Sequence, residues 1–300
     1  MAIKKKIDNS LVDKVEQFIN TTSKLKVAVI GETIIDEFID VTYEGQSMKS
    51  TCPVFKLVGE KSIQQGGAAA IAGHLKSFVK SVTLITNSNR EIVKTRYVEA
   101  FDKKKHVEIN KFDTKNFPKV KINTTDYDIV IVADFGHGFC DKLEINNGFH
   151  LMCQTNSNNF GFNRLSKWKQ KRKKSVCMDL REASLQMNKK FKECTDKEAI
   201  ELYNYEVNTE SLFVTTGAKG SLYTNGKNIV RHPSFKTEIV DTIGAGDTFF
   251  AFACVSTHLK DNTNDPLLVP SLAASLSTTW LCNERSVTAN TLLKHATRYL

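Results

Sequence analysis

Short apolar runs separated by polar, glycine-containing turns dominate the hydrophobic pattern of the chain. The first run, KVAVIG at 26–31, places Val27, Val29 and Ile30 together, as in a strand that is buried on both faces of a parallel sheet. The runs SVTLIT, DIVIVADFG, SVCMD and SLFVTTG follow, most of them ending at Gly or Asp, with helical stretches between several of them. This alternation predicts an α/β fold with a doubly wound, mostly parallel sheet flanked by helices.

One segment has a different pattern. Residues 37–60 partly alternate apolar and polar positions, with Gly45, Pro53 and Gly59 as interruptions, which predicts two or three strands with one exposed face. We interpret it as a small β lid, to which 94–110 could also belong. A helix is expected at about 9–22, and GGAAAIAGHLKSF predicts a second one opened by a glycine pair. Because there is no internal repeat and no low-complexity linker, we expect a single domain over 1–300.

Composition narrows the class of protein. With 41% hydrophobic and 25% charged residues the chain is typical of a globular protein, and no apolar run approaches the about 18 residues of a membrane span. The N-terminal lysines are not followed by the apolar stretch of a secretory signal. Seven cysteines, an odd number without a CxxC pair, favour free thiols in a reducing cytoplasm over a disulfide framework or a zinc site.

The net charge of +9 is concentrated in clusters at 4–6, 103–105 and 169–174. These clusters are either solvated surface or a nucleic-acid site. No interleaved aromatic residues and no nucleic-acid motif accompany them, so we expect surface charge and no nucleic-acid partner. A basic chain is equally compatible with small phosphorylated ligands.

The stretch VDTIGAGDTFFAF at 240–252 carries the clearest candidate chemistry. Gly244 and Gly246 flank Ala245 directly before an apolar helix, where backbone N–H groups and the helix dipole favour an anion such as phosphate. The spacing is neither GxGxxG nor GxxxxGK[ST]. Asp247 is then either the N-cap of this helix or a general base beside a phosphoryl group, and the loop by itself favours neither.

DTIGAGDTFFA resembles the second signature of the ribokinase/PfkB carbohydrate kinases, which implies a ribokinase-like fold. The resemblance implies that Gly244, Ala245 and Gly246 form an anion hole and that Asp247 deprotonates a sugar hydroxyl. It further implies ATP and Mg²⁺ as cofactors. The residues implied to bind the nucleotide are Asp241 and Thr242 in this motif, and Thr216, Gly217 and Gly220 in VTTGAKGSLY.

Other motifs follow in the order of the same family. VIGETIIDEF resembles the opening strand whose aspartate, here Asp36, binds the sugar, and QQGGAAAIAG resembles the motif that sets Gly66 and Gly67 against the substrate. DLRE resembles the N-x-x-E element, so Glu182 is implied to order magnesium through water.

Within the family, CPVFKL, KTRYV, VADFGHG, QTNSNNFGFN and CNERSVT resemble the D-glycero-D-manno-heptose 7-phosphate kinases of surface-polysaccharide precursor synthesis. Lys94 and Arg96 then either contact a substrate phosphate or are exposed charges on the lid. Asn156 and Asn158 either bond sugar hydroxyls or belong to a surface loop.

The chain also departs from the family pattern. Ala70 replaces an asparagine, Glu32 and Asp179 are substitutions near ligand positions, and about one βα unit is missing after SVTLIT. We therefore expect an ATP- and Mg²⁺-dependent sugar kinase, with a heptose 7-phosphate or another sugar as substrate. The alternative is a non-catalytic binder of sugar phosphates or nucleotides on the same fold. We also expect homodimer pairing through the exposed lid, and no membrane association.

Overall fold

An eight-stranded sheet forms the main body of the protein in the computed structural model, which describes residues 10–88, 91–113, 117–154, 163–205, 208–259 and 265–299. Six neighbouring strands are parallel, and β13 and β14 continue the sheet in antiparallel fashion at one edge. The α/β fold expected from the sequence is confirmed. The spatial order is β14 (Ile229–His232), β13 (Ser221–Thr224), β12 (Leu212–Thr215), β11 (Lys173–Asp179), β10 (Phe149–Cys153), β8 (Ile129–Asp134), β1 (Lys26–Gly31) and β4 (Ser81–Thr86).

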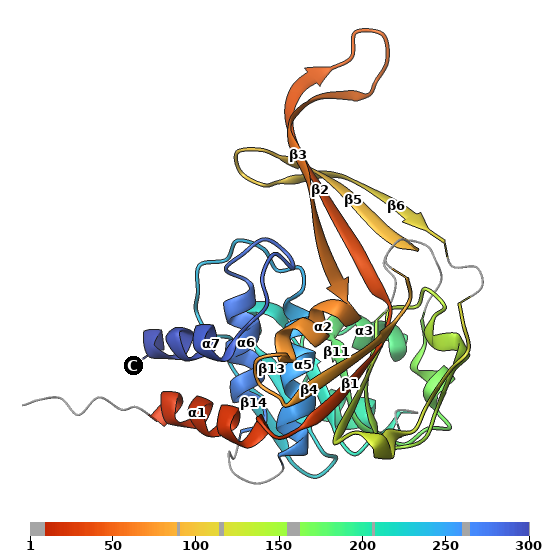
Figure 1. Ribbon diagram of the computed structural model, residues 1–300, viewed down its shortest axis with the longest axis vertical. Coiled ribbons are helices and arrows are strands. Elements are labelled where there is room, and N and C mark those ends of the chain that lie inside the picture. The colour runs from red at the N-terminus through yellow and green to blue at the C-terminus, as the bar shows by residue number, and fades with distance from the viewer. Residues whose placement is uncertain are drawn as a thin grey trace, which may run out of the picture.

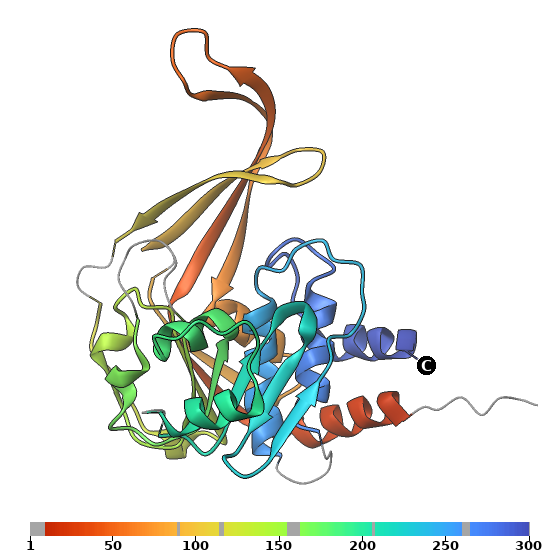
Figure 2. The ribbon, with the colours of Figure 1, turned by 180° about the vertical axis from the view of Figure 1, so that it is seen from behind.

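Helices cover both faces of this sheet. On the face seen in Figure 1, α5 packs against β8 and β11, and α2 packs against β1 and β4. Figure 2 brings α3 and α4 to the front. None of the described helices combines the length and the apolar character that crossing a bilayer requires. The helices are α1 (Ser10–Thr22), α2 (Ala68–Leu75), α3 (Leu180–Gln186), α4 (Asp196–Asn204), α5 (Ala245–His258), α6 (Leu268–Ser277) and α7 (Ala289–Ala296).

The smaller elements complete the main body. Strands β7 (Val120–Ile122) and β9 (Leu143–Ile145) form a separate parallel pair. Short 3-10 turns lie at Thr124–Asp126, Cys140–Lys142, Leu165–Trp168, Gly217–Lys219 and Thr297–Tyr299.

Burial explains why the apolar runs form the central strands. All six residues of β8 are buried, as are the last five of β1, because strands between two helical layers have no solvent-facing side. On the helical face of Figure 1, Phe18 of α1 and Phe78 after α2 meet Phe252 of α5, with ring centroids 4.8–6.3 Å apart. These rings hold α1 and α5 against the same side of the sheet.

The helix N-termini are of two kinds. Helices α3, α4 and α7 begin with capping boxes, in which Asp179, Thr195 and Thr288 accept a hydrogen bond from a backbone N–H three residues later. Helices α2 and α5 instead begin at Gly67 and Gly244, with no side-chain cap. Their first N–H groups bond backbone carbonyl oxygens instead, Ala68 N that of Glu32 and Ala245 N that of Thr242.

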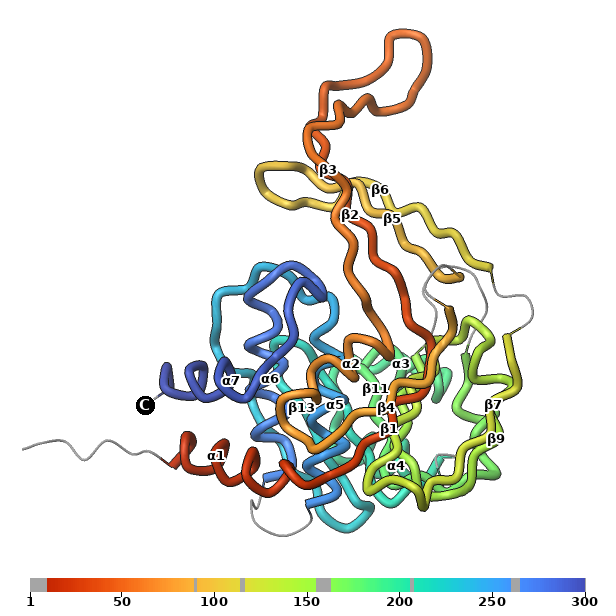
Figure 3. Tube along the Cα trace, in the orientation of Figure 1, coloured from red at the N-terminus to blue at the C-terminus, as the bar shows by residue number. Residues whose placement is uncertain are grey.

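A second sheet of four strands, here called the projecting sheet, stands away from the main body (Figures 1 and 3). Its order is β3 (Pro53–Gly67), β2 (Thr33–Gln46), β5 (Ile92–Glu99) and β6 (Lys105–Phe112). Strands β2 and β5 pair in parallel, and the other two pairings are antiparallel. It extends beyond the segments 37–60 and 94–110 of the sequence prediction because β2 and β3 run down into the main body.

The chain crosses between the two sheets almost without linkers. Glu32 alone separates β1 from β2, and β3 passes directly into α2 between Gly67 and Ala68. The two crossings are joined, since Ala68 N donates to the Glu32 carbonyl oxygen at 2.9 Å. Asn87, just after β4, bonds both backbone groups of Thr33 at the start of β2 (2.7 and 3.2 Å). As expected from the sequence, β4 leads to β5 without a βα unit between them, and β4 is an edge strand.

Candidate active site

Asp247 lies in the first turn of α5, three residues after the N-cap. That N-cap is Gly244, which adopts a left-handed conformation with φ 85°, so the interpretation of Asp247 as the N-cap is wrong. A Cβ on Gly244 would lie 2.6 Å from Asn283 Oδ1, so both its backbone conformation and its close approach require glycine. Asp247 is thereby left for another role at the start of the helix.

The N-terminus of α5 presents unpaired donors. Ala245 N donates to the Thr242 carbonyl oxygen at 3.3 Å and Thr248 N to that of Gly244 at 2.9 Å. Within the described residues, the N–H groups of Gly246 and Asp247 have no partner. Together with the dipole of a 14-residue helix, these groups can hold an anion.

Asp247 is half-buried, and its carboxyl lies near another acid, Asp36. Burial raises its pKa to about 7, and the nearby charge of Asp36 adds to the rise, while Lys94 and a hydrogen bond from the Gly67 backbone lower it. Residues from α5, β2, β5 and the start of α2 therefore meet at one point. A carboxyl with a pKa of about 7 can take up a proton near neutral pH.

Asp36 lies on β2 at the junction of the projecting sheet and the main body. Its carboxylate forms an ion pair with Arg96 Nη1, and the Asn283 amide lies 3.5 Å from its second oxygen. Gly66 stands against it, because a Cβ there would be 2.6 Å from Asp36 Oδ2. Ala70 is buried in α2. The sequence therefore placed Asp36, Gly66 and Gly67 correctly in one neighbourhood, although it did not indicate a partner for Asp36.

Arg96 is buried and paired, so the prediction that it could be an exposed charge on the lid is wrong. Only 5% of its side chain is exposed, and its Nε donates to Glu108 Oε2 at 2.8 Å. Its guanidinium also lies over the Phe38 ring, 5.6 Å from the centroid. Two carboxylates already occupy Arg96, so it is poorly placed to receive a phosphate as well.

Lys94 differs from Arg96. It forms no ion pair within the described part of the chain, and its charge acts on Asp247, Glu108 and His137. His137, in the loop after β8, packs against Phe112 with centroids 4.6 Å apart. Its pKa falls to about 4, first because it is buried and then because of Lys94. A cationic side chain thus faces the space between the projecting sheet and the main body.

Glu182 and Asp179 form a capping box at the end of β11. Asp179 N donates to Glu182 Oε2 at 2.8 Å, and Glu182 N donates to Asp179 Oδ1 at 2.7 Å. Burial raises the pKa of the Cys177 thiol, and the charges of Glu182, Asp179 and Asp247 raise it further. The three carboxylates therefore gather around the C-terminal end of β11, where α/β proteins bind ligands.

Of the predicted nucleotide contacts, Thr216, Gly217 and Gly220 form the tight turn between β12 and β13. Thr216 closes this turn with two hydrogen bonds to the Gly220 carbonyl oxygen, at 2.8 and 2.9 Å. Thr242 is exposed beside the start of α5, whereas Asp241 is buried and pairs with Lys105 of β6 at 2.9 Å. Asn156 and Asn158 lie outside the described residues.

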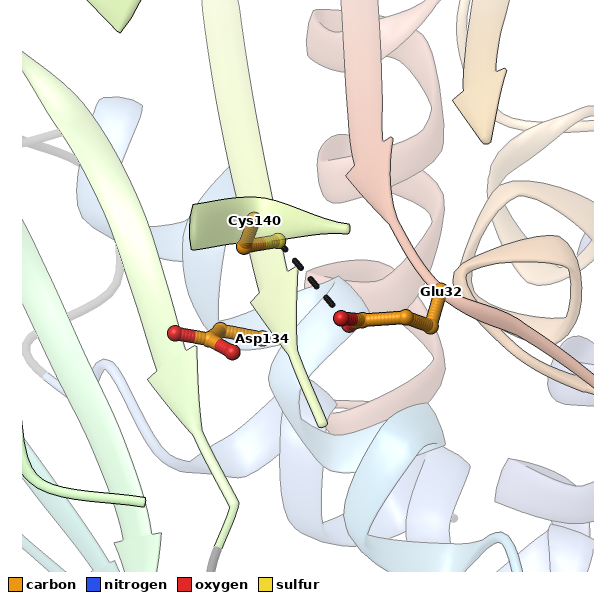
Figure 4. A group of neighbouring side chains, drawn as sticks. All are labelled: Glu32, Asp134 and Cys140. Carbon is orange, nitrogen blue, oxygen red and sulfur yellow. Dashed lines mark hydrogen bonds between the residues drawn. The ribbon is translucent and has the colours of Figure 1, made fainter. Parts of the chain in front are cut away.

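Glu32, Asp134 and Cys140 lie together in the main body as three potential metal ligands (Figure 4). Glu32 accepts hydrogen bonds from Phe135 N and Phe139 N at 2.9 and 3.1 Å, and burial followed by the Asp134 charge raises its pKa. Asp134 is held by Trp168 Nε1 at 2.8 Å and Lys167 Nζ at 2.7 Å.

Burial raises the pKa of the Cys140 thiol well above its usual range. A protonated thiol beside two occupied carboxylates does not suit Mg²⁺, which prefers oxygen ligands. Glu32 therefore supports the loop after β8, and its carboxylate is not available to a ligand.

Sequence reasoning missed Asn283 and Lys105 as members of this site. The Asn283 side chain bonds Asp36 and lies against the Gly244 position, and the Asn283 backbone N–H donates to Gln64 Oε1 at 2.8 Å. The CNERSVT motif around Asn283 was noticed only as a family resemblance. Lys105 was counted as part of a surface cluster, although it pairs with Asp241.

Comparison with known sequences finds a match in the C-terminal half. Residues 174–267, which contain β11 to α5, match the profile of the pfkB family carbohydrate kinases. The chain is also similar to the ribokinase of Bacillus subtilis (strain 168), with 41% identity over 87 residues. That similarity covers 29% of this chain and 28% of the length of the ribokinase.

Comparison with solved structures covers almost the whole chain. The ribokinase of Thermotoga maritima superimposes with a TM-score of 0.63 and 17% identity over 91% of this chain and 99% of that one. The Arabidopsis thaliana ribokinase complexed with ribose and ATP gives a TM-score of 0.62 and 14% identity, over 91% and 99%. At these identities the likeness shows the fold, which is the ribokinase-like fold predicted from the sequence.

Proposed function

We propose that the protein is an ATP-dependent sugar kinase, on the premise that its family match and its fold both point to the pfkB and ribokinase carbohydrate kinases. One observation carries the proposal. Asp247, with a pKa raised to about 7, stands in the first turn of a glycine-opened helix in which the N–H groups of Gly246 and Asp247 have no partner among the described residues. A base and an anion hole at one place are the two components that phosphoryl transfer to a hydroxyl requires.

The reaction is a single displacement. The sugar hydroxyl oxygen forms a bond to the γ-phosphorus of ATP, the bond between that phosphorus and the β,γ-bridging oxygen breaks, and ADP leaves. Asp247 takes the hydroxyl proton. The N–H groups of Gly246 and Asp247 stabilise the negative charge on the transferring group, in a site where glycine lets the backbone come close.

ATP and Mg²⁺ are the cofactors of this proposal. Bound Mg²⁺ supplies charge neutralisation between the phosphates. Glu182 would order its water shell, since its carboxylate is fixed in a capping box with Asp179 at the C-terminal end of β11 and its charge, like that of Asp247, acts on Cys177. Thr216, Gly217, Gly220 and Thr242 remain the nucleotide contacts of the proposal. Asp241 is not among them, because its carboxylate pairs with Lys105.

The sugar side consists of Asp36, Gly66, Gly67 and Lys94. Lys94 supports a substrate that carries a negative group, because its charge reaches Asp247 and it has no ion-pair partner within the described residues. A heptose 7-phosphate is the substrate that we propose, and another phosphorylated sugar is the nearest alternative. Arg96 would act indirectly, by holding Asp36 in place. The projecting sheet would close over the sugar as a lid and exclude water.

A non-catalytic sugar-phosphate or nucleotide binder on the same fold is the second candidate. It is favoured by the ion pair that occupies Asp36 and by the apolar Ala70. The retained Asp247 and its raised pKa favour the kinase.

An ADP-release assay over free sugars, hexose phosphates and heptose phosphates separates the two candidates. We expect turnover in the intact protein that falls about a hundredfold to ten-thousandfold in Asp247→Asn, with ATP binding unchanged by calorimetry. Asp13→Asn, on the exposed face of α1, is the matched control. Binding of ATP or sugar without turnover on any substrate would leave the non-catalytic candidate.

Pairing of two chains through the projecting sheet belongs to the proposal. One face of this sheet holds a groove of about 560 Å³ lined by residues such as Val41, Phe55, Leu57 and Tyr97, and Leu57 is 65% exposed. Sedimentation equilibrium of the intact protein and of Leu57→Glu tests this, and a monomeric intact protein would contradict it. The cysteines, six buried and one exposed and all unpaired, support a reducing compartment such as the cytoplasm.

A further inference from the structure

An ion pair connects the projecting sheet to the loop that precedes the anion hole. Lys105, the first residue of β6, places its Nζ 2.9 Å from Asp241 Oδ2, three residues before Gly244. Only 6% of the Asp241 side chain and 31% of the Lys105 side chain are exposed. The two residues are 136 positions apart in the chain, so only the position of the projecting sheet brings them together.

Asp241 transmits this contact to the backbone of its own loop. Its second oxygen, Oδ1, accepts a hydrogen bond from Ile243 N at 3.2 Å. The backbone N–H groups of Val240 and Asp241 both donate to the Thr278 carbonyl oxygen at the end of α6, at 2.8 and 3.2 Å. The carboxylate thus links a cation on the projecting sheet to the peptide directly before Gly244.

Apolar contacts accompany the ion pair at the same junction. Phe38 of β2 and Val98 of β5 form a small buried cluster with Cys282, and Ile243 and Leu281 pack against it. Cys282 adopts a left-handed conformation with φ 48°, which is unfavourable for a residue with a side chain and marks a turn fixed by its surroundings. Ile243 is therefore held on both its backbone and its side chain by groups that depend on the projecting sheet.

We propose that Lys105 is a positioning residue that fixes the anion-hole loop only when the projecting sheet lies over the site. This inference rests on the proposed function for its catalytic consequence. When the sheet moves away, Lys105 and the apolar contacts leave together. Asp241 then loses the one cation that it contacts in the described part of the chain and turns towards water, which releases Ile243 N. The loop 241–244 loosens, and the unpaired N–H groups of Gly246 and Asp247 directly after it are no longer held in position.

The arrangement would make phosphoryl transfer depend on closure. A kinase whose anion hole forms only under a closed sheet does not stabilise transfer to water while the site is open. Asp241 accordingly acts on the loop and not as a nucleotide contact.

Three substitutions test the inference in the full chain. Lys105→Met removes the cation and keeps the length of the side chain. Lys105→Arg keeps the ion pair. Lys103→Met is the matched control, because Lys103 pairs with Asp40 at 3.0 Å within the projecting sheet and has a similarly exposed side chain (41%).

Two measurements are made on each variant. Hydrogen exchange of the 240–248 segment reports the amides of Val240, Asp241, Ile243 and Thr248. We expect exchange about tenfold faster in Lys105→Met, the scale of a typical coupling between two sites, with Lys105→Arg and Lys103→Met unchanged. In the ADP-release assay we expect kcat to fall about tenfold in Lys105→Met with the KM for ATP unchanged, because the loss is felt in the transition state.

The two measurements separate the possible failures. If the intact protein has no turnover on any sugar, the proposed function fails. The hydrogen-exchange data then test by themselves whether Lys105 positions the loop. Exchange in Lys105→Met equal to that in Lys103→Met would overturn the inference. So would a loss of activity that Lys105→Arg does not restore, or one that appears in KM and leaves kcat unchanged.

Discussion

Arg96 and Asp36 form an ion pair at the junction of the two sheets, and only 5% of each side chain is exposed. The aspartate comes from β2 and the arginine from the neighbouring parallel strand β5. The carboxylate that we propose for the sugar is therefore already neutralised by the protein. A sugar hydroxyl would bind to an aspartate that Arg96 and Asn283 hold in a fixed orientation.

Arg96→Met is expected to destabilise the protein strongly. It leaves Asp36 buried beside Asp247 without its cation, and breaking a buried pair in this way costs about 3–5 kcal/mol. In Arg96→Met/Asp36→Asn the loss should be smaller than the sum of the two single losses, because the double variant no longer has a buried unpaired charge at Asp36, and Glu108, which also loses Arg96, is 33% exposed. Urea unfolding measures both effects. Lys61→Met is the control, since the Lys61 side chain is 46% exposed in its pair with Glu37 and such a pair contributes about 0–1 kcal/mol. Equal losses in Arg96→Met and Lys61→Met would contradict the expectation.

The raised pKa of Asp247 predicts a pH dependence of activity. The base must be ionised to accept a proton, so kcat should rise about tenfold per pH unit below pH 7 and level off above it. Initial rates with saturating sugar and ATP measure this. A rate that stays flat from pH 5 to pH 8 would exclude Asp247 as the base.

The same shift predicts a pH dependence of stability. Below pH 4 the carboxyl is protonated in the folded and unfolded chain, and it affects neither. Between about pH 4 and 7 the unfolded chain releases the proton while the folded chain keeps it, so the free energy of unfolding falls as the pH rises. Asp247→Asn lacks this loss. Its stability relative to the intact protein should increase from pH 4 to pH 7 and then stay constant, whereas Asp13→Asn should show no such trend in urea unfolding.

Glu32→Ala is expected to cost about 2–5 kcal/mol, because it leaves the buried N–H groups of Phe135 and Phe139 without an acceptor. Urea unfolding measures the loss. Glu16→Ala, at an exposed position of α1, is the control and should change stability by less than about 0.5 kcal/mol. A stable Glu32→Ala would show that the loop after β8 does not depend on this carboxylate.

Local pattern was sufficient to predict much of the main body. Val27, Val29 and Ile30 are fully buried in β1, as their spacing predicted, because a strand between two helical layers needs apolar residues on both faces. The glycine loop at 244–246 was likewise predictable, because the N-cap of α5 has a left-handed backbone conformation that favours glycine. The segments of the projecting sheet were recognisable because an exposed face leaves alternate positions polar.

The partners within the site were not predictable from local pattern. Arg96 and Asp36 are 60 residues apart, and Asn283 and Asp36 are 247 apart, so no spacing rule connects them. The sequence also did not indicate that Lys105, one of three consecutive lysines at 103–105, forms an ion pair with Asp241. Such contacts depend on how two sheets are set against each other, which is a property of the whole fold.

The two joined crossings between the sheets have a consequence for how a substrate enters. Glu32 and Ala68 are hydrogen-bonded to each other, and Gly67 beside them also bonds Asp247. In the opening of the projecting sheet that we propose, the chain would rotate about these same few peptides, which lie beside Asp247. The same peptides would then set both the position of Asp247 and the rate at which the projecting sheet opens. A substitution that makes these peptides more flexible is expected to speed product release and to disturb the alignment of Asp247.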